Sequence, residues 1–114
     1  MKSKFNWSKV MTEYPLSFKF FRETVFPNTP IVNKTILSLY HTRNLYFFFD
    51  SIGILLSVEC LSENQWIGHI QLRSGFSFSV KGSHNTRVEL ENTAFLECFS
   101  QLERRLNNLK NKKN

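Results

Sequence analysis

The sequence predicts an α+β domain in which helices cover one face of a three-stranded antiparallel meander, in the order α-α-β-β-β-α. Three consecutive segments between residues 54 and 81 alternate apolar and polar side chains. This period of two is typical of strands that bury one face. Stripes of apolar residues at helical spacing precede and follow these segments, and helices of this kind would cover the apolar face.

Two short helices are expected near the start of the chain. The first spans residues 7–14, with Ser8 as its N-cap. Pro15 suits the first turn of a second helix, which runs over residues 15–26. The segment 31–39 fits either a short strand or irregular structure, and both alternatives stay open.

A further helix is expected immediately before the strands. It begins at Thr42 as the N-cap and ends at Ile52, with Gly53 at the C′ position. One face of this helix carries apolar residues at i, i+3, i+4 and i+7, namely Leu45, Phe48, Phe49 and Ile52. Tyr46 and Phe47 lie off this face, so the core does not need them.

The alternation in the strands also predicts their register, because a slip of one residue would send core side chains to solvent. A five-residue loop, residues 61–65, joins the first two strands, and a three-residue loop, residues 73–75, joins the last two. Gly75 supplies the left-handed position that such a loop favours. The expected pairs on the apolar face are Ile54 with Leu72, Leu56 with Ile70, Val58 with Gly68, Cys60 with Trp66, Leu72 with Phe76 and Ile70 with Phe78. The side chains of Cys60, Trp66, Leu72 and Phe76 are all expected to lie under helices.

The last helix has the clearest signals. Residues 86–89, Thr-Arg-Val-Glu, match a capping box. An apolar stripe then continues for about four turns, through Phe95, Cys98, Phe99, Leu102, Leu106 and Leu109. We expect one domain over residues 1–106 and a basic, frayed tail over residues 107–114.

The composition favours a single folded domain. The chain has 114 residues, of which 41% are hydrophobic and 15% aromatic, enough to form the core of one ordinary domain. No apolar run reaches the roughly 18 residues that a membrane-spanning helix needs, and residues 1–7 lack the apolar segment of a signal peptide. A cytoplasmic location is therefore expected, with Cys60 and Cys98 as free thiols buried in the core.

The net charge of +6 is unevenly distributed. Residues 104–114 hold five of the 15 Lys and Arg residues and none of the nine Asp and Glu residues, so residues 1–103 carry a net charge of only +1. Basic residues at a helix C-terminus offset the helix macrodipole. They can equally contact phosphate groups, and the sequence leaves both interpretations open.

The chemically active residue types form no recognised catalytic or metal-binding motif. The sequence contains no C-x-x-C, H-E-x-x-H, G-x-S-x-G or phosphate-binding glycine motif. His69 is expected on the polar face of the sheet and Cys60 on the apolar face, so these two side chains would point apart. Glu59 would lie diagonally opposite His69, in an arrangement more typical of a cross-strand pair than of a catalytic site. The prediction is therefore a protein that is not an enzyme and that needs no metal, cofactor or small-molecule ligand.

Three segments carry a resemblance to known proteins. Residues 14–18 (YPLSF), 45–54 (LYFFFDSIGI) and 86–95 (TRVELENTAF) resemble small uncharacterised proteins encoded by gut-bacterial phages and mobile elements. The resemblance covers residues 7–106, and its motifs are structural: helix starts, a helix stop and a core stripe. It implies a phage or mobile-element origin and carries no molecular function.

Two functional hypotheses follow. The first is a non-enzymatic protein–protein interaction protein, which binds a host or phage protein or a second copy of itself, and which has no membrane partner. Its candidate interface consists of Tyr46, Phe47, Leu55 and Ile67. The second is a nucleic-acid-binding accessory protein that uses the basic tail and the 81–87 turn, which leads into a helix N-terminus. Its candidate contacts are Arg73, Lys81, Ser83, Arg87, Arg104, Arg105, Lys110, Lys112 and Lys113.

Overall fold

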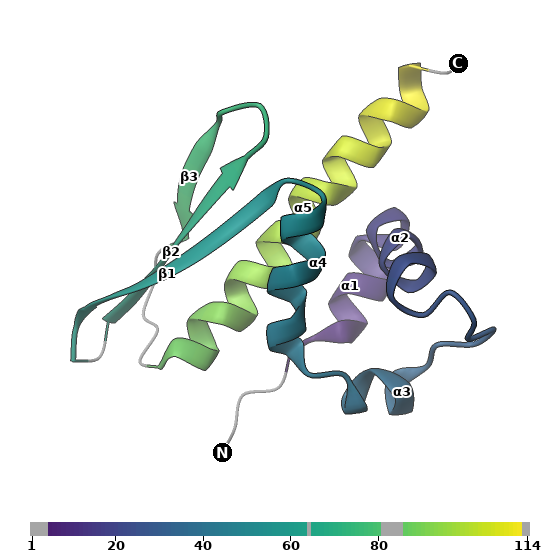
Figure 1. The fold of residues 1–114 in the computed structure, drawn as a ribbon, viewed down its shortest axis with the longest axis horizontal. Coiled ribbons are helices and arrows are strands. Elements are labelled where there is room, and N and C mark those ends of the chain that lie inside the picture. The colour runs from purple at the N-terminus through teal and green to yellow at the C-terminus, as the bar shows by residue number, and fades with distance from the viewer. Residues whose placement is uncertain (1–4, 64, 81–85, 113–114) are drawn as a thin grey trace.

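The computed structural model describes residues 5–63, 65–80 and 86–112. It confirms the predicted fold class and element order, with additional short helices (Figure 1). The helices are α1 (Trp7–Glu13), α2 (Pro15–Val25), α3 (Lys34–Leu39), the 3-10 turn η1 (Thr42–Asn44), α4 (Leu45–Ser51) and α5 (Arg87–Lys112). The strands are β1 (Ile54–Ser62), β2 (Gln65–Leu72) and β3 (Ser77–Val80). None of the helices in these residues is long and apolar enough to cross a membrane.

The sheet is an antiparallel meander, and its register is as predicted. Strand β2 lies between β1 and β3, and all four predicted pairs between β1 and β2 are found. Ile70 lies opposite Phe78. At the second turn, the backbone N–H of Leu72 donates to the carbonyl of Phe76 at 2.8 Å, and Gly75 has the positive φ of 95° that this turn requires. The predicted five-residue first loop is too long, because Ser62 already pairs with Gln65 after an irregularity in β1.

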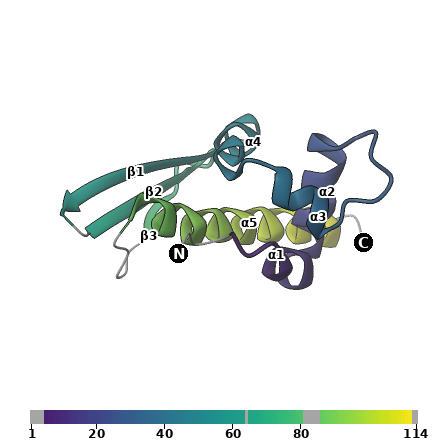
Figure 2. The same cartoon turned by 90° about the horizontal axis from the view of Figure 1, so that it is seen from below.

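The long helix α5 joins the two halves of the fold. Its N-terminal half packs on the apolar face of the sheet, and its C-terminal half packs on α2 (Figure 2). The carboxylate of Glu103 accepts hydrogen bonds from the backbone N–H groups of Ser17, at 2.7 Å, and Leu16, at 3.3 Å. These are N–H groups of the first turn of α2, which have no partner within the helix. Glu103 therefore caps α2 from a distant part of the chain.

The core is built largely from aromatic rings. Phe99 of α5 lies at its centre, with ring contacts to Phe5, Trp7, Phe21, Phe48 and Phe49. Several of these pairs are T-shaped, the geometry that the ring quadrupoles favour. The aromatic-rich composition is thus used mainly to fill the space between α1, α2, α4 and α5.

Part of the apolar sheet face extends beyond its helical cover. Cys60 is exposed, Trp66 and Leu72 are only partly buried, and Phe76 is 64% exposed. The prediction that these four side chains all lie under helices is therefore wrong. The reason is geometric: the β1–β2 end of the sheet projects past the start of α5 (Figure 1), and the β2–β3 turn lies to one side of the helix.

Two predicted helix caps are shifted by one or two residues. Asn6, and not Ser8, caps α1, because its Oδ1 accepts a hydrogen bond from the N–H of Lys9 at 3.1 Å. His41, and not Thr42, precedes the next helical segment, and its Nδ1 accepts from the N–H of Arg43 at 3.3 Å. In both cases a polar side chain just upstream of the predicted cap takes the role.

The segment 31–39 contains a helix, which neither open alternative included. Asn33 caps α3 by accepting a hydrogen bond from the N–H of Ile36 through its Oδ1 at 3.0 Å.

At the end of α4, Gly53 has a φ of 79°, as expected for a C′ glycine. A Cβ at this position would lie 2.7 Å from Nε of Arg73, so the absence of a side chain also lets Arg73 approach closely.

Helix α5 begins as the capping box predicts and extends across the predicted domain boundary. Oγ1 of Thr86 accepts the N–H of Glu89 at 3.2 Å, and the same hydroxyl lies 3.2 Å from the Glu89 carboxylate. The stripe is buried as far as Leu102, Leu106 is half-buried, and Leu109 is exposed. The helix nevertheless continues to Lys112, so one element spans the end of the core and most of the basic tail.

Candidate functional sites

Glu91 is the centre of a buried polar cluster that connects α4 with the start of α5. It is only 3% exposed, and no other carboxylate in the described residues is buried. Oε2 of Glu91 accepts a hydrogen bond from the hydroxyl of Tyr46 at 2.6 Å. Nε of Arg43 lies 3.4 Å from Oε1, and Nε of Arg87 lies 3.3 Å from Oε2. The two half-exposed guanidinium groups and the phenol compensate the cost of burying this charge.

Tyr46 is therefore part of the folded structure, and the prediction that the core does not need it is wrong. Its ring packs edge-on against Phe95, with centroids 5.1 Å apart. Burial, and secondarily the neighbouring Glu91, raise the pKa of Tyr46 to about 12, so the hydroxyl stays protonated and donates. The sequence contained one indication of this cluster. Glu91 lies four residues before Phe95, and therefore on the same face of the helix as the apolar stripe.

The other candidate interface residues do not share one environment. Phe47 is 75% exposed and Leu55 is about half exposed, as expected for surface contacts. Ile67 is only 8% exposed and lies outside the main core cluster, so its predicted role as a surface contact is wrong. Of the four predicted interface residues, only Phe47 and Leu55 remain available.

Basic residues from two distant segments line one surface hollow. Arg73 comes from the β2–β3 turn, and Arg104, Arg105 and Lys112 come from the C-terminal half of α5. The hollow has a volume of about 610 Å³, and the described residues that line it include neither Asp nor Glu. Four of the predicted nucleic-acid contacts thus lie around one space.

Part of this hollow is fixed by contacts with the α4–β1 connection. Nη1 of Arg105 donates to the backbone carbonyl of Ile52 at 2.7 Å, which satisfies an acceptor at the C-terminus of α4. Arg73 lies against Gly53, the next residue. One guanidinium therefore has a structural contact, while Arg104 is exposed and Lys112 lies on the last turn of α5.

The remaining basic candidates are not part of this hollow. Arg87 is paired with Glu91. Arg87 also lies roughly 25 Å from Arg104 along the axis of α5, at a rise of 1.5 Å per residue. Lys110 lines a separate shallow hollow beside α2, where Glu23 provides an opposite charge. Three further candidates lie outside the described residues, and these are Lys81, Ser83 and Lys113.

An exposed aromatic residue ends the β2–β3 turn, whose residues Arg73 and Ser74 line the basic hollow. Phe76 follows the turn that carries Arg73, and its ring centroid is 6.0 Å from that of Phe78. By the alternation of the strand, these two rings share the sheet face of Leu72, which lines the hollow. The sequence pattern assigned Phe76 to the core, because it could not show how far the helical cover extends.

The polar sheet face carries a row of three side chains. Nε2 of His69 lies 3.2 Å from Oε2 of Glu59, which confirms the predicted cross-strand pair, and its Nδ1 lies 3.4 Å from Oγ of Ser79. All three residues are exposed. Serine and imidazole are farther apart than in a typical nucleophile–base pair, so the row fits a cross-strand polar contact. No group of three His, Cys, Asp or Glu residues that could hold a metal occurs in the described chain.

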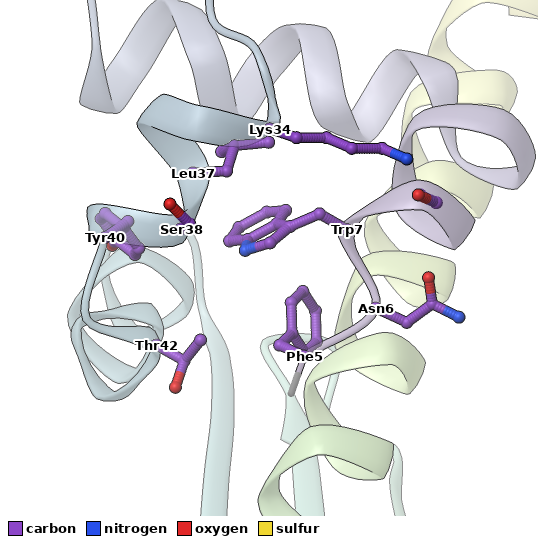
Figure 3. Close-up of a pocket in the computed structure, with 9 residues that line it drawn as sticks. Phe5, Asn6, Trp7, Lys34, Leu37, Ser38, Tyr40 and Thr42 are labelled. Carbon is purple, nitrogen blue, oxygen red and sulfur yellow. The ribbon is translucent and has the colours of Figure 1, made fainter. Parts of the chain in front are cut away.

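A further pocket lies between the start of α1 and α3 (Figure 3). Its apolar walls come from Phe5, Trp7, Leu37 and Tyr40, and Lys34 and several small polar side chains surround them. The volume is about 510 Å³. Burial raises the pKa of Tyr40 to about 12, so this phenol is neutral at physiological pH. This pocket could not be predicted from the sequence, because its walls come from two segments, around residues 5–8 and 34–42, that are distant in the chain.

The chain matches no protein-family model, no curated protein and no solved structure. Functional inferences therefore depend on the geometry of its own residues.

Proposed function

We propose that the protein binds single-stranded nucleic acid through the basic hollow formed by the β2–β3 turn and the C-terminal half of α5. The convergence of Arg73, Arg104, Arg105 and Lys112 carries this proposal. Phosphate groups are attracted to such a cluster, and their binding releases counterions. The described residues that line the hollow include no carboxylate, so no lining side chain neutralises the positive charge that it offers to phosphate.

Phe76 supports a single-stranded target in preference to a duplex. Proteins that bind single strands combine a basic groove with exposed aromatic rings on which bases stack. Phe76 is 64% exposed at the turn that carries Arg73, and its ring centroid lies 6.0 Å from that of Phe78. In a duplex the bases are already stacked on one another, so an exposed ring beside the phosphate contacts is most useful when the bases are free.

The test is fluorescence anisotropy with a labelled 12-nucleotide single strand and the matching duplex, over a series of salt concentrations. We expect tighter binding of the single strand and an affinity that falls linearly in a plot of log K against log salt. Replacing Arg73 and Arg104 by Gln should weaken binding and flatten this slope. Phe76→Ser should weaken binding by roughly 5- to 150-fold, the range for one stacked base, without changing the slope.

The matched control is Lys19→Gln, which removes an exposed positive charge from α2, outside the basic hollow. It should change affinity much less than the Arg73 and Arg104 substitutions. The proposal is wrong if the native protein does not bind the strand at low salt. It is also wrong if the hollow variants and the control bind equally well.

A second candidate function is protein–protein interaction, and the exposure of Phe47 favours it. This ring is 75% exposed on α4, next to the anchored Tyr46. Exposed aromatic residues are frequent interface anchors. Phe47→Ser should abolish self-association or capture of a host protein while changing stability by no more than about 0.5 kcal/mol.

Analytical ultracentrifugation measures the first of these effects, and affinity purification from the native host measures the second. Leu39→Ser on α3 is the control, since Leu39 is at least as exposed as Phe47. If Phe47→Ser and Leu39→Ser behave like the native protein in both assays, Phe47 does not form an interface.

A further inference from the structure

The pocket between α1 and α3 has the size and composition of a small-molecule site. Its volume of about 510 Å³ falls in the range of typical ligand pockets, which are mostly apolar with a few polar groups. Figure 3 shows the rings of Phe5, Trp7 and Tyr40 around the space, with Leu37 from α3. This surface shares no residue with the basic hollow, so it would serve a separate function.

The indole N–H of Trp7 is a buried donor with no acceptor. Trp7 is only 8% exposed, yet within the described residues its Nε1 makes no hydrogen bond. Buried tryptophan normally finds a partner for this group, which can only donate. In Figure 3 the indole nitrogen lies on the ring edge that opens into the pocket, on the side of Ser38 and Thr42. A ligand that placed an oxygen there would satisfy it.

The charge around the pocket specifies the ligand further. Lys34 is exposed and lines the pocket, and the described lining residues include no Asp or Glu to neutralise it. Its side chain extends alongside Trp7, with the ammonium group on the opposite side of the indole from Nε1 (Figure 3), so Lys34 contributes charge to the pocket and no direct contact at Nε1. A cationic ligand would be repelled by Lys34, and a hydrocarbon would leave the Trp7 donor without a partner. An anion with an oxygen acceptor gives the Trp7 donor a partner, and its negative charge is attracted by Lys34.

We propose that this pocket binds a small apolar carboxylate. One carboxylate oxygen accepts the hydrogen bond from Nε1 of Trp7, and Lys34 balances the negative charge. The apolar body of the ligand lies against Phe5, Leu37 and Tyr40. No bond is made or broken in this proposal, which concerns binding alone.

The experiment is an NMR titration that follows the two indole N–H resonances of the protein, from Trp7 and Trp66. Phenylacetate is the probe, and phenylacetamide is its neutral control. We expect phenylacetate to shift the Trp7 resonance saturably and to leave that of Trp66, on the sheet, unchanged. Phenylacetamide should bind more weakly. Equal shifts of both indoles, or no saturable shift with phenylacetate, would overturn the proposal.

Two variants test the assigned roles. Lys34→Gln should weaken phenylacetate binding by about two- to fivefold, as for the loss of one exposed ion pair, and should leave phenylacetamide binding unchanged. Ser38→Trp should block the pocket to both probes, whereas Thr35→Trp, at an exposed position of the same helix outside the pocket, should not. Unchanged phenylacetate affinity in both Lys34→Gln and Ser38→Trp would show that the probe binds elsewhere.

Discussion

The hydroxyl of Tyr46 donates a 2.6 Å hydrogen bond to Oε2 of Glu91, and this contact ties α4 to the second turn of α5. Glu91 lies on the buried side of α5, where a charged group is costly unless it is hydrogen-bonded and paired. Tyr46, Arg43 and Arg87 together satisfy that requirement. A residue that looks redundant on its own helix therefore becomes necessary because of a residue 45 positions later in the chain.

Tyr46→Phe is expected to lower the free energy of unfolding by about 1.5 to 3 kcal/mol, the usual range for a hydrogen bond to a charged group. Glu91→Ala should be at least as destabilising, because it leaves the phenol without its acceptor. In a double-mutant cycle measured by urea denaturation, the two changes should be strongly non-additive. Tyr14→Phe is the control, since Tyr14 makes no hydroxyl hydrogen bond among the described residues. Equal stability of the two Tyr→Phe variants would contradict the structural role of Tyr46.

The same contact predicts a loss of stability at alkaline pH. Burial first, and Glu91 second, raise the pKa of Tyr46 to about 12, compared with about 10 in the unfolded chain. The folded state therefore favours the protonated phenol, and this stabilisation is fully present below pH 10 and is lost as the pH rises through 12. Native protein should lose more stability between pH 9 and pH 11.5 than Tyr46→Phe does. Urea unfolding curves at the two pH values measure this, and parallel losses would contradict the assignment.

The strand register could be predicted because it depends on local signals. The period-two alternation and the glycine at position 75 restrict the pairing of neighbouring strands, and the pairs Cys60–Trp66 and Ile70–Phe78 are found as expected. The burial of individual strand residues could not be predicted in the same way, because it depends on where α5 crosses the sheet. Cys60 and Phe76 are therefore exposed, although their place in the alternation is that of core residues.

In the candidate sites, too, local sequence patterns predict the residue types but not which residues come together. The sequence identified Arg73 and Arg104 as possible phosphate contacts from their charge alone. It could not show that these two residues line one hollow while Arg87 is neutralised by Glu91. Glu91 itself lies in phase with the apolar stripe of α5, but glutamate is seldom buried unless it is paired, and its partners come from distant parts of the chain. Convergence of distant residues requires the packing of the helices on the sheet, which no local pattern specifies.

The two cysteines should differ sharply in reactivity. Cys60 is exposed on β1, contrary to the expectation of a buried thiol, whereas Cys98 is buried among the core rings and burial raises the pKa of its thiol. A disulfide reagent such as 5,5′-dithiobis(2-nitrobenzoate) should modify Cys60 rapidly in the native protein. Cys98 should react only on unfolding, and Cys60→Ser should remove the fast phase. Two fast thiols in the native protein would contradict the burial of Cys98.

The C-terminal end of α5 should contribute to binding more than to folding. Residues 107–112 are all exposed, and Leu106 is the last half-buried member of the stripe. Deleting residues 107–114 should therefore lower the melting temperature by less than about 8 °C, which corresponds to roughly 1–2 kcal/mol. It should weaken binding of the single-stranded oligonucleotide, because it removes Lys112 from the basic hollow together with the other tail lysines.

A full-length variant with Lys110, Lys112 and Lys113 changed to Gln separates the contribution of charge from that of the helix, since it retains the helix and loses the charge. Equal loss of affinity in both proteins would assign the effect to charge. A larger drop in melting temperature on deletion would instead show that the last turns of α5 pack against the domain.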